Sequence, residues 1–171
     1  MSTEDQSKPS TIRVGLIGAG GNTRSRHLPG FRAIEGVEVI GVANRTEKSS
    51  RRAAKELNIP RHYNTWRELI DTPDIDAVCI GTWPNTHAAA TIAALEARKH
   101  VLCEALLARN LSEARQMLAF SEQNPGLVTQ VVPSPFTLST DSKILELIAD
   151  GSLGRIISIE IIASSGFAKP D

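Results

Sequence analysis

Residues 12–27, IRVGLIGAGGNTRSRH, constrain the fold of this chain more than any other stretch. The apolar run at 12–17 predicts a buried strand, a glycine-rich turn follows, and residues 23–34 are compatible with a helix. In such a unit the first glycine permits the tight turn, and the second lets the backbone approach a pyrophosphate at the helix start. A turn without a ligand is the alternative, because Thr23 occupies the third glycine position. The predicted pyrophosphate-binding residues are Gly18, Gly20, Gly21, Asn22 and Thr23.

The composition indicates a soluble globular protein without nucleic-acid or membrane partners. The chain has 171 residues, of which 41% are hydrophobic, and its 19 basic and 19 acidic residues give no net charge. This length suits about one domain with a short remainder. Cys79 and Cys103 lie in apolar runs, so we expect buried free thiols in a reducing compartment and no metal site. The polar N-terminus has no signal-peptide pattern and no apolar run could span a membrane, so the predicted location is the cytoplasm.

Strands and helices alternate along most of the chain. This alternation predicts an α/β fold, a Rossmann-type doubly wound parallel sheet with crossover connections. The predicted strands are 12–17, 37–43, a short one near 62–63, 76–80, 100–103 and 126–132. The predicted helices are 23–34, broken early by Pro29-Gly30, then 46–57, 66–70, 86–97 and 111–123.

The character of the sequence changes after Pro135. We expect a disordered tail at 1–10, an NAD(P)-binding domain at 11–135, and the start of a truncated C-terminal substrate or oligomerisation domain at 136–171. That start comprises a helix at 139–149 and a strand at 155–163, RIISIEIIA, with no obvious partner in the chain. Because an unpaired strand seeks another edge, we expect a homo-oligomer formed through it.

The end of the second strand indicates which dinucleotide binds. A carboxylate there would favour NAD, whereas an arginine accommodates the 2′-phosphate of NADP. Here the strand runs into Asn44-Arg45-Thr46, with no acid until Glu47. Arg45 can stack on adenine and pair with a phosphate, while Asn44 and Thr46 can donate to it. The sequence favours NADP over NAD, and an ordinary exposed helix start is the alternative.

Two further loops follow predicted strands and are candidates for the nicotinamide side. In an open α/β sheet, ligands bind outside the carboxyl ends of the strands. The loop after 76–80 holds Thr82, Trp83, Asn85 and His87, and Glu104 follows 100–103. Asn85 is alternatively a helix cap, and Glu104 an ordinary loop acid. His87 is the residue in this crevice whose type titrates near neutral pH.

The strings GLIGAGGNTRSRHLPG, ANR, TWPNTH, HVLCEALLA and GSLGRI together resemble the glucose–fructose oxidoreductase/inositol dehydrogenase (Gfo/Idh/MocA) family. TWPNTH is similar to that family's T-P-N-x-x-H loop, with Trp83 in place of a small residue. The resemblance implies an N-terminal Rossmann domain and a C-terminal α/β domain with a large mixed sheet. It also implies NAD(P)-dependent oxidation of sugars, polyols or related compounds by dimers or tetramers.

Two departures from the family pattern limit this expectation. The family's E-K-P signature corresponds to Glu104, Ala105 and Leu106, so the lysine that helps position or deprotonate the reacting hydroxyl is absent. The family's D-x-x-x-H pair is absent as well. We therefore assign no catalytic residue, with Glu104 in a supporting role at most, and expect this chain alone to be inactive. The alternative is a catalytically incompetent module that binds a dinucleotide or a partner.

Overall fold

The computed structural model describes residues 11–132 and 140–160. The chain divides into two units, residues 1–133 and 134–171, and each is described by itself. The predicted tail at 1–10 and the proline-rich turn at 133–135 lie outside the described residues.

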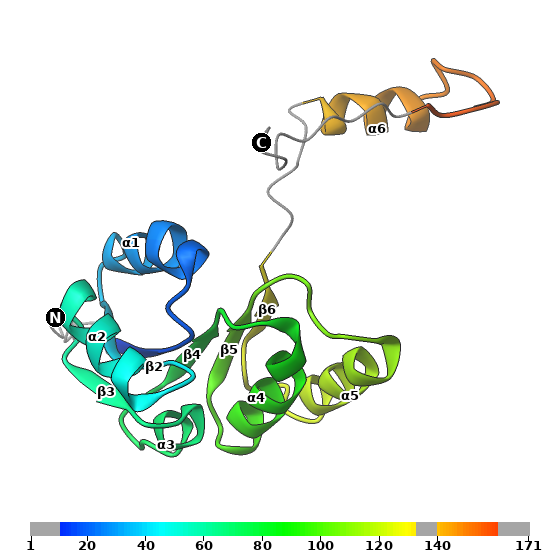
Figure 1. Ribbon diagram of the computed structural model, residues 1–171. Coiled ribbons are helices and arrows are strands. Elements are labelled where there is room, and N and C mark those ends of the chain that lie inside the picture. The colour runs from blue at the N-terminus through cyan, green and yellow to red at the C-terminus, as the bar shows by residue number, and fades with distance from the viewer. Residues whose placement is uncertain (1–10, 133–139, 161–171) are drawn as a thin grey trace, which may run out of the picture. The chain divides into compact units, whose positions relative to one another are not determined.

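The first unit is a six-stranded parallel sheet with helices on both faces (Figure 1). Its strands are β1 (Ile12–Ile17), β2 (Val37–Ala43), β3 (Arg61–Tyr63), β4 (Ala77–Ile80), β5 (His100–Cys103) and β6 (Thr129–Val131). Its helices are a π-helical turn (Thr23–His27), α1 (Leu28–Arg32), α2 (Glu47–Leu57), α3 (Trp66–Ile70), α4 (Pro84–Glu96) and α5 (Leu111–Glu122). The strand order is β3-β2-β1-β4-β5-β6 with every pair parallel, which confirms the predicted doubly wound Rossmann-type sheet. The order reverses between β1 and β4, where ligands bind in such sheets.

The strands end level with one another at their carboxyl ends. Ile17 on β1 is in register with Ala43 on β2 and with Ile80 on β4. Ala43 is in register with Tyr63 on β3, and Ile80 with Cys103 on β5. The loops that follow these five strands therefore emerge at a single edge of the sheet.

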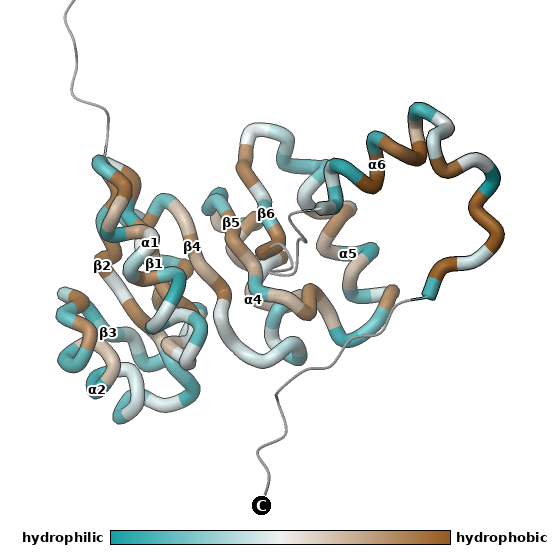
Figure 2. The backbone as a smooth tube through the Cα atoms, turned by 90° about the horizontal axis from the view of Figure 1, so that it is seen from above, coloured by the Kyte–Doolittle hydropathy of each residue, from teal (hydrophilic) through white to brown (hydrophobic). Residues whose placement is uncertain are grey.

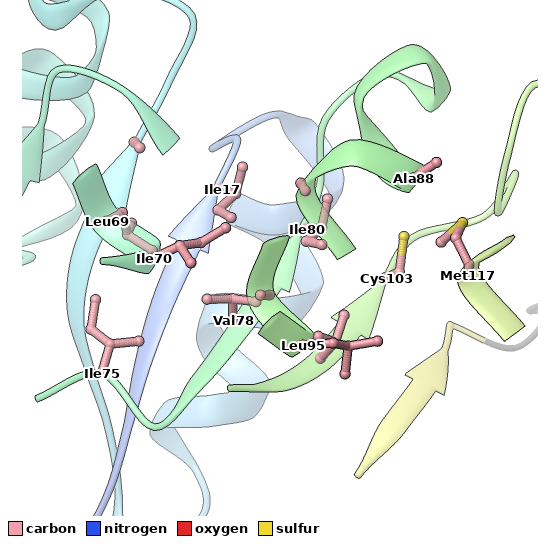
Figure 3. Close-up of a cluster of buried hydrophobic side chains, with 14 of the residues drawn as sticks. Ile17, Leu69, Ile70, Ile75, Val78, Ile80, Ala88, Leu95, Cys103 and Met117 are labelled. Atoms are coloured by element: carbon pink, nitrogen blue, oxygen red, sulfur yellow. The ribbon is translucent and has the colours of Figure 1, made fainter. Parts of the chain in front are cut away.

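Two apolar clusters hold the helices against the sheet because side chains alternate along each strand. On β4, Val78 and Ile80 join the cluster under α3, α4 and α5, whereas Cys79 joins the cluster under α1 and α2. Figure 3 shows Leu69, Ile80 and Met117 in the first cluster, which continues across several strands. The sheet is thus covered on both faces around β1, as near-continuous apolar strands require.

The helix after the glycine turn is not broken at Pro29-Gly30, in contrast to the prediction. The π-helical turn runs directly into α1, and the Leu28 N–H donates to the Thr23 carbonyl. Pro29 lies in the first turn of α1, where the N–H that proline lacks is not needed. The helical backbone therefore continues through Pro29, with a π-helical turn directly before α1.

Polar side chains cap the starts of three of the next helices. The Thr46 and Thr65 side chains accept from the N–H groups of Ser49 and Glu68, and Asn110 caps α5. Hydrophilic residues dominate α2, which buries only Ser50, Ala53 and Ala54 (Figure 2). Each cap satisfies an N–H group that the helix itself leaves unpaired.

The second unit contributes α6 (Asp141–Ala149) and residues 150–160. Hydrophobic and hydrophilic residues alternate along α6 in Figure 2. The predicted strand at 155–163 is not formed over 155–160, and 161–163 lie outside the described residues. A strand is defined by the hydrogen bonds that it makes to a neighbour, and the described residues provide none for this segment.

Both cysteines are buried free thiols, as predicted. Burial raises the pKa of the Cys79 thiol to about 12 and that of Cys103 to about 11. Both side chains therefore remain protonated near neutral pH and serve as small core residues. Within residues 11–132 and 140–160, none of the helices is both long and apolar enough to cross a membrane.

Candidate functional site

The glycine turn after β1 brings bare backbone to the edge of the sheet. Gly18 has φ +89°, and a Cβ there would lie 2.7 Å from the Gly81 carbonyl oxygen, so the position requires glycine. A Cβ at Gly20 would meet only that oxygen, at 3.9 Å, and a Cβ at Gly21 would meet no atom within 4 Å. These two residues therefore face open space, which fits a turn that admits a pyrophosphate against its backbone.

Thr23, at the third glycine position, is buried beneath this turn and stabilises it by a hydrogen bond. Its side chain is 1% exposed and its hydroxyl donates to the Gly18 carbonyl at 2.9 Å. A Cβ at Gly81 would overlap that hydroxyl, so the threonine occupies space that Gly81 leaves empty. The close helix–strand contact that a third glycine usually permits is here achieved by Gly81, which directly follows β4.

Asn44 and Thr46, which follow β2, form hydrogen bonds to other residues of the chain. The Asn44 Oδ1 accepts from the Ala19 N–H at 2.8 Å and its Nδ2 donates to the Ser49 carbonyl at 3.1 Å. The Thr46 hydroxyl accepts from the Ser49 N–H at 3.2 Å as the cap of α2. Asn44 thus fixes the glycine turn against β2, and Thr46 fixes the start of the helix.

A cleft of about 430 Å³ lies at this edge of the sheet. It is lined by Ile17, Ala43, Asn44, Arg45, Asn64, Thr65, Trp66, Arg67, Thr82, Trp83, Asn85 and Thr86. Arg45 is exposed and makes no ion pair with the described residues, and the Arg67 guanidinium carbon lies 4.1 Å from the centre of the Trp66 ring. The lining contains two arginines, two tryptophans and no acidic residue, which suits an anionic aromatic ligand.

The loop after β4 forms one wall of this cleft. Helix α4 begins at Pro84, two residues before the predicted start, with Trp83 as its N-cap residue. Asn85 therefore lies inside the first turn, and the alternative that it caps the helix is wrong. Proline at the first helical position explains the earlier start. The Trp83 side chain is 82% exposed. Thr82, Trp83 and Asn85 therefore stand together at the cleft, as predicted.

His87 lies behind this wall instead of in the open crevice. The residue is 0% exposed, with Nδ1 2.9 Å from the Leu106 carbonyl oxygen and Nε2 3.1 Å from the Thr82 carbonyl oxygen. The imidazole therefore bridges the loop after β4 and the loop after β5. Its contacts give it a structural role, which is to hold these two loops together.

Glu104 is the centre of a polar cluster at the end of β5. Its carboxylate accepts from the Asn22 side-chain amide, from His27 Nε2 at 2.5 Å, and from the Ala105 N–H at 3.1 Å. The side chains of His27 and Glu104 are only 11% and 12% exposed. This cluster joins the first helix to β5, and the Ala105–Leu106 peptide bond that follows is cis.

The basic residues after the glycine turn have separate surroundings. Arg24 forms an ion pair with Glu56 at 3.0 Å and also donates to the Ala19 carbonyl, so it stabilises the first helix against α2. Arg26 is exposed. Of the basic residues in this turn, only His27 faces the Glu104 cluster.

The sequence-predicted residues form two groups. Arg45, Thr82, Trp83 and Asn85 share the cleft, whereas Asn22 and Glu104 share the polar cluster. Sequence reasoning missed Asn64, Trp66 and Arg67 in the cleft wall. Their signal was available, because they follow a short parallel strand whose carboxyl end lies at the same edge.

Comparison with known proteins matches this chain to one protein family. The Gfo/Idh/MocA family, described as "Oxidoreductase family, NAD-binding Rossmann fold", matches residues 12–131. The 1,5-anhydro-D-fructose reductase of Ensifer adhaerens is 32% identical over 149 residues, which are 87% of this chain and 44% of that protein. The chain thus spans less than half the length of the curated relatives it matches.

Solved structures agree with this relationship. The myo-inositol 2-dehydrogenase of Lactobacillus plantarum matches with a TM-score of 0.72 and 25% identity, over 86% of this chain and 44% of that one. KijD10, a 3-ketoreductase from Actinomadura kijaniata solved with NADP and TDP-benzene, matches with a TM-score of 0.71 and 25% identity, over 83% and 43%.

Proposed function

This chain belongs to the Gfo/Idh/MocA oxidoreductase family, and we propose that it is the nucleotide-binding part of an enzyme that transfers hydride between NADP or NAD and a sugar, polyol or related hydroxyl compound. The proposal also includes assembly into a homo-oligomer and a cytoplasmic location. The buried free thiols of Cys79 and Cys103 fit the reducing conditions of that compartment.

One observation carries the proposal. The level ends of β1, β2 and β4 bring Ile17, Arg45 and the loop at 82–86 to one cleft at the point where the strand order reverses, and the glycine turn directly follows Ile17. Ligands of open α/β sheets bind at this point. The open backbone at Gly20 and Gly21 fits a pyrophosphate there.

Each group of residues has a distinct part in holding the dinucleotide. The backbone of the turn at 20–22 approaches the pyrophosphate, and Arg45 faces the adenosine end. Thr82 and Asn85 line the wall between the two ends, and Glu104, held by Asn22 and His27, supports the nicotinamide side. When bound, the nicotinamide donates or accepts the hydride, and the protein orients it.

The substrate class follows from the relatives. Their names specify 1,5-anhydro-D-fructose and myo-inositol, which are polyhydroxylated ring compounds. We therefore propose a polyhydroxylated or keto-sugar substrate for the enzyme of which this chain forms the cofactor-binding part.

A second candidate is a module that binds a dinucleotide without turnover. Ala105 stands where the family resemblance places a lysine, and alanine can neither donate a proton nor hold a positive charge near a substrate. The Glu104 carboxylate is also occupied by three donors from the chain itself. Both observations favour binding without chemistry in the chain as it stands.

The test is a fluorescence titration of the 171-residue chain with NADPH and NADH. Gly20→Val projects a side chain into the space proposed for the pyrophosphate, and Gly126→Val is its control at an exposed glycine with no neighbour within 4 Å. We expect wild type and the control to bind and Gly20→Val to bind at least roughly tenfold more weakly. Absence of binding by wild type, or equal binding by Gly20→Val, would overturn the proposal.

Turnover separates the two candidates. We expect the chain to bind the dinucleotide, and a panel of sugars and polyols then decides between chemistry and binding alone. Reduction of NADP with any of these substrates supports the enzyme, whereas binding without turnover supports the module.

A further inference from the structure

We propose that Arg67, stacked on Trp66 at the start of α3, acts with Arg45 to bind the 2′-phosphate of NADP and so sets the preference for NADP over NAD. This inference rests on the proposed function, because it assigns a specificity residue to the same dinucleotide site. It adds a residue from the start of α3, the helix after β3, to the one that follows β2.

The charge distribution of the cleft is the first argument. Arg45 and Arg67 both line it, and its lining contains no aspartate or glutamate. Neither arginine forms an ion pair with the described residues, whereas Arg51 on the neighbouring helix α2 pairs with Glu47. Two uncompensated guanidinium groups in one cleft create a local excess of positive charge. Such an excess favours a ligand with an additional phosphate.

The stacking of Arg67 is the second argument. Its guanidinium carbon lies 4.1 Å from the centre of the Trp66 ring, and Trp66 is itself partly buried against the apolar cluster under α3. The indole is thus a fixed platform that limits the motion of an otherwise exposed arginine. A stacked guanidinium keeps its N–H edge available, and that edge matches the oxygens of a phosphate.

The topology explains why Arg45 and Arg67, distant in sequence, line the same cleft. Ala43 and Tyr63, the last residues of β2 and β3, are in register. Arg45 therefore follows the end of one strand by two residues, and Arg67 follows the end of the adjacent strand by four. In parallel sheets these loops emerge at the same edge, where the adenosine end of a dinucleotide lies.

The test measures binding of four nucleotides to the full chain. NADPH and 2′,5′-ADP carry the 2′-phosphate, whereas NADH and 5′-AMP lack it. We expect Arg67→Ala to weaken NADPH and 2′,5′-ADP by roughly tenfold and to change NADH and 5′-AMP by less than about twofold. Arg67→Lys keeps the charge but not the planar fork, so its loss is intermediate.

Arg115→Ala is the control, because Arg115 is exposed on α5, outside the cleft, and the change in net charge is the same. An unchanged circular dichroism spectrum excludes misfolding of the variants. Equal losses for NADPH and NADH in Arg67→Ala would show that the residue serves the adenine ring and would overturn the inference, as would no loss at all. Failure of the wild type to bind any dinucleotide would instead overturn the proposed function.

Discussion

The two ends of the crevice differ in how far their polar side chains are already satisfied. The proposed adenosine end, formed by Arg45, Trp66 and Arg67, presents two arginines without acidic residues in the cleft lining. At the proposed nicotinamide end, Glu104 and His27 pair with each other, and His87 behind the wall contacts two carbonyl oxygens of the chain. The arginines of the first end can pair with an anionic ligand. The hydrogen bonds of the second end instead join the first helix, the loop after β4 and the loop after β5.

This contrast indicates that the first end contributes affinity for a ligand and the second end contributes rigidity. Uncompensated charges add affinity when an anion arrives, because no internal partner has to be displaced. Paired groups such as His27 and Glu104 give rigidity, which prepares one wall of a site. The residues of the described chain thus provide a cofactor cleft more fully than they provide a reaction centre.

The largest effect is expected on stability, from His87→Ala. The substitution removes a fully buried side chain and the imidazole that lies between the Thr82 and Leu106 carbonyl oxygens, which we expect to lower the free energy of unfolding by about 2–5 kcal/mol. Urea denaturation measures it. His62→Ala, at an exposed position, is the control and should change stability by less than about 0.5 kcal/mol. A loss as small as the control's would contradict the structural role of His87.

The next effect concerns the adenosine end. The double variant Arg45→Ala/Arg67→Ala removes both charges that line the cleft, so NADPH should bind roughly 100-fold more weakly, about 2.7 kcal/mol. NADH should lose little, because it carries no 2′-phosphate. Isothermal titration calorimetry of both cofactors gives the ratio. A double variant that still prefers NADPH would place the 2′-phosphate elsewhere.

A smaller effect is expected from Glu104→Gln at the nicotinamide end. Glutamine can still accept from Asn22 and His27, but the hydrogen bonds are no longer charge-assisted, so stability should fall by about 1 kcal/mol. The NADPH to NADH affinity ratio should be unchanged. Glu96→Gln, exposed on α4, is the matched control. A changed ratio would mean that the two ends of the crevice are coupled.

The smallest effect is the response of binding to salt. Exposed charges are screened over about 8 Å at physiological ionic strength and over about 3 Å at 1 M. NADPH affinity should therefore fall several-fold more than NADH affinity as sodium chloride is raised, because only NADPH engages both arginines. Titrations at matched pH in low and high salt measure this difference. Parallel curves for the two cofactors would argue against an electrostatic origin of the preference.

The sequence predicted the elements that obey simple patterns. Apolar runs such as 12–17 and 100–103 became strands with the predicted bounds, and the helix predicted at 66–70 formed as α3 (Trp66–Ile70). Local chemistry decides these features, so a single sequence is sufficient to find them.

The features that escaped prediction depend on tertiary contacts. The hydrogen bond from Thr23 to Gly18 depends on the space left by Gly81, just after β4, and the His27–Glu104 pair joins residues 77 positions apart. Arg67 resembles any exposed helical arginine until the sheet places it in the cleft with Arg45. The strand expected at 155–163 is not formed over its described part, 155–160, for the same reason, because a strand needs a partner that its own sequence does not specify.

The most direct test of the account maps where NADPH binds. Hydrogen–deuterium exchange of the 171-residue chain with and without NADPH reports which backbone amides the cofactor protects. We predict protection in the turn at 18–23, after β2 at 44–46, at the start of α3 at 64–67 and in the loop at 82–86, with α5 unchanged. Protection confined to other segments, with the glycine turn exchanging as in the free protein, would contradict the central claim that this crevice binds the dinucleotide.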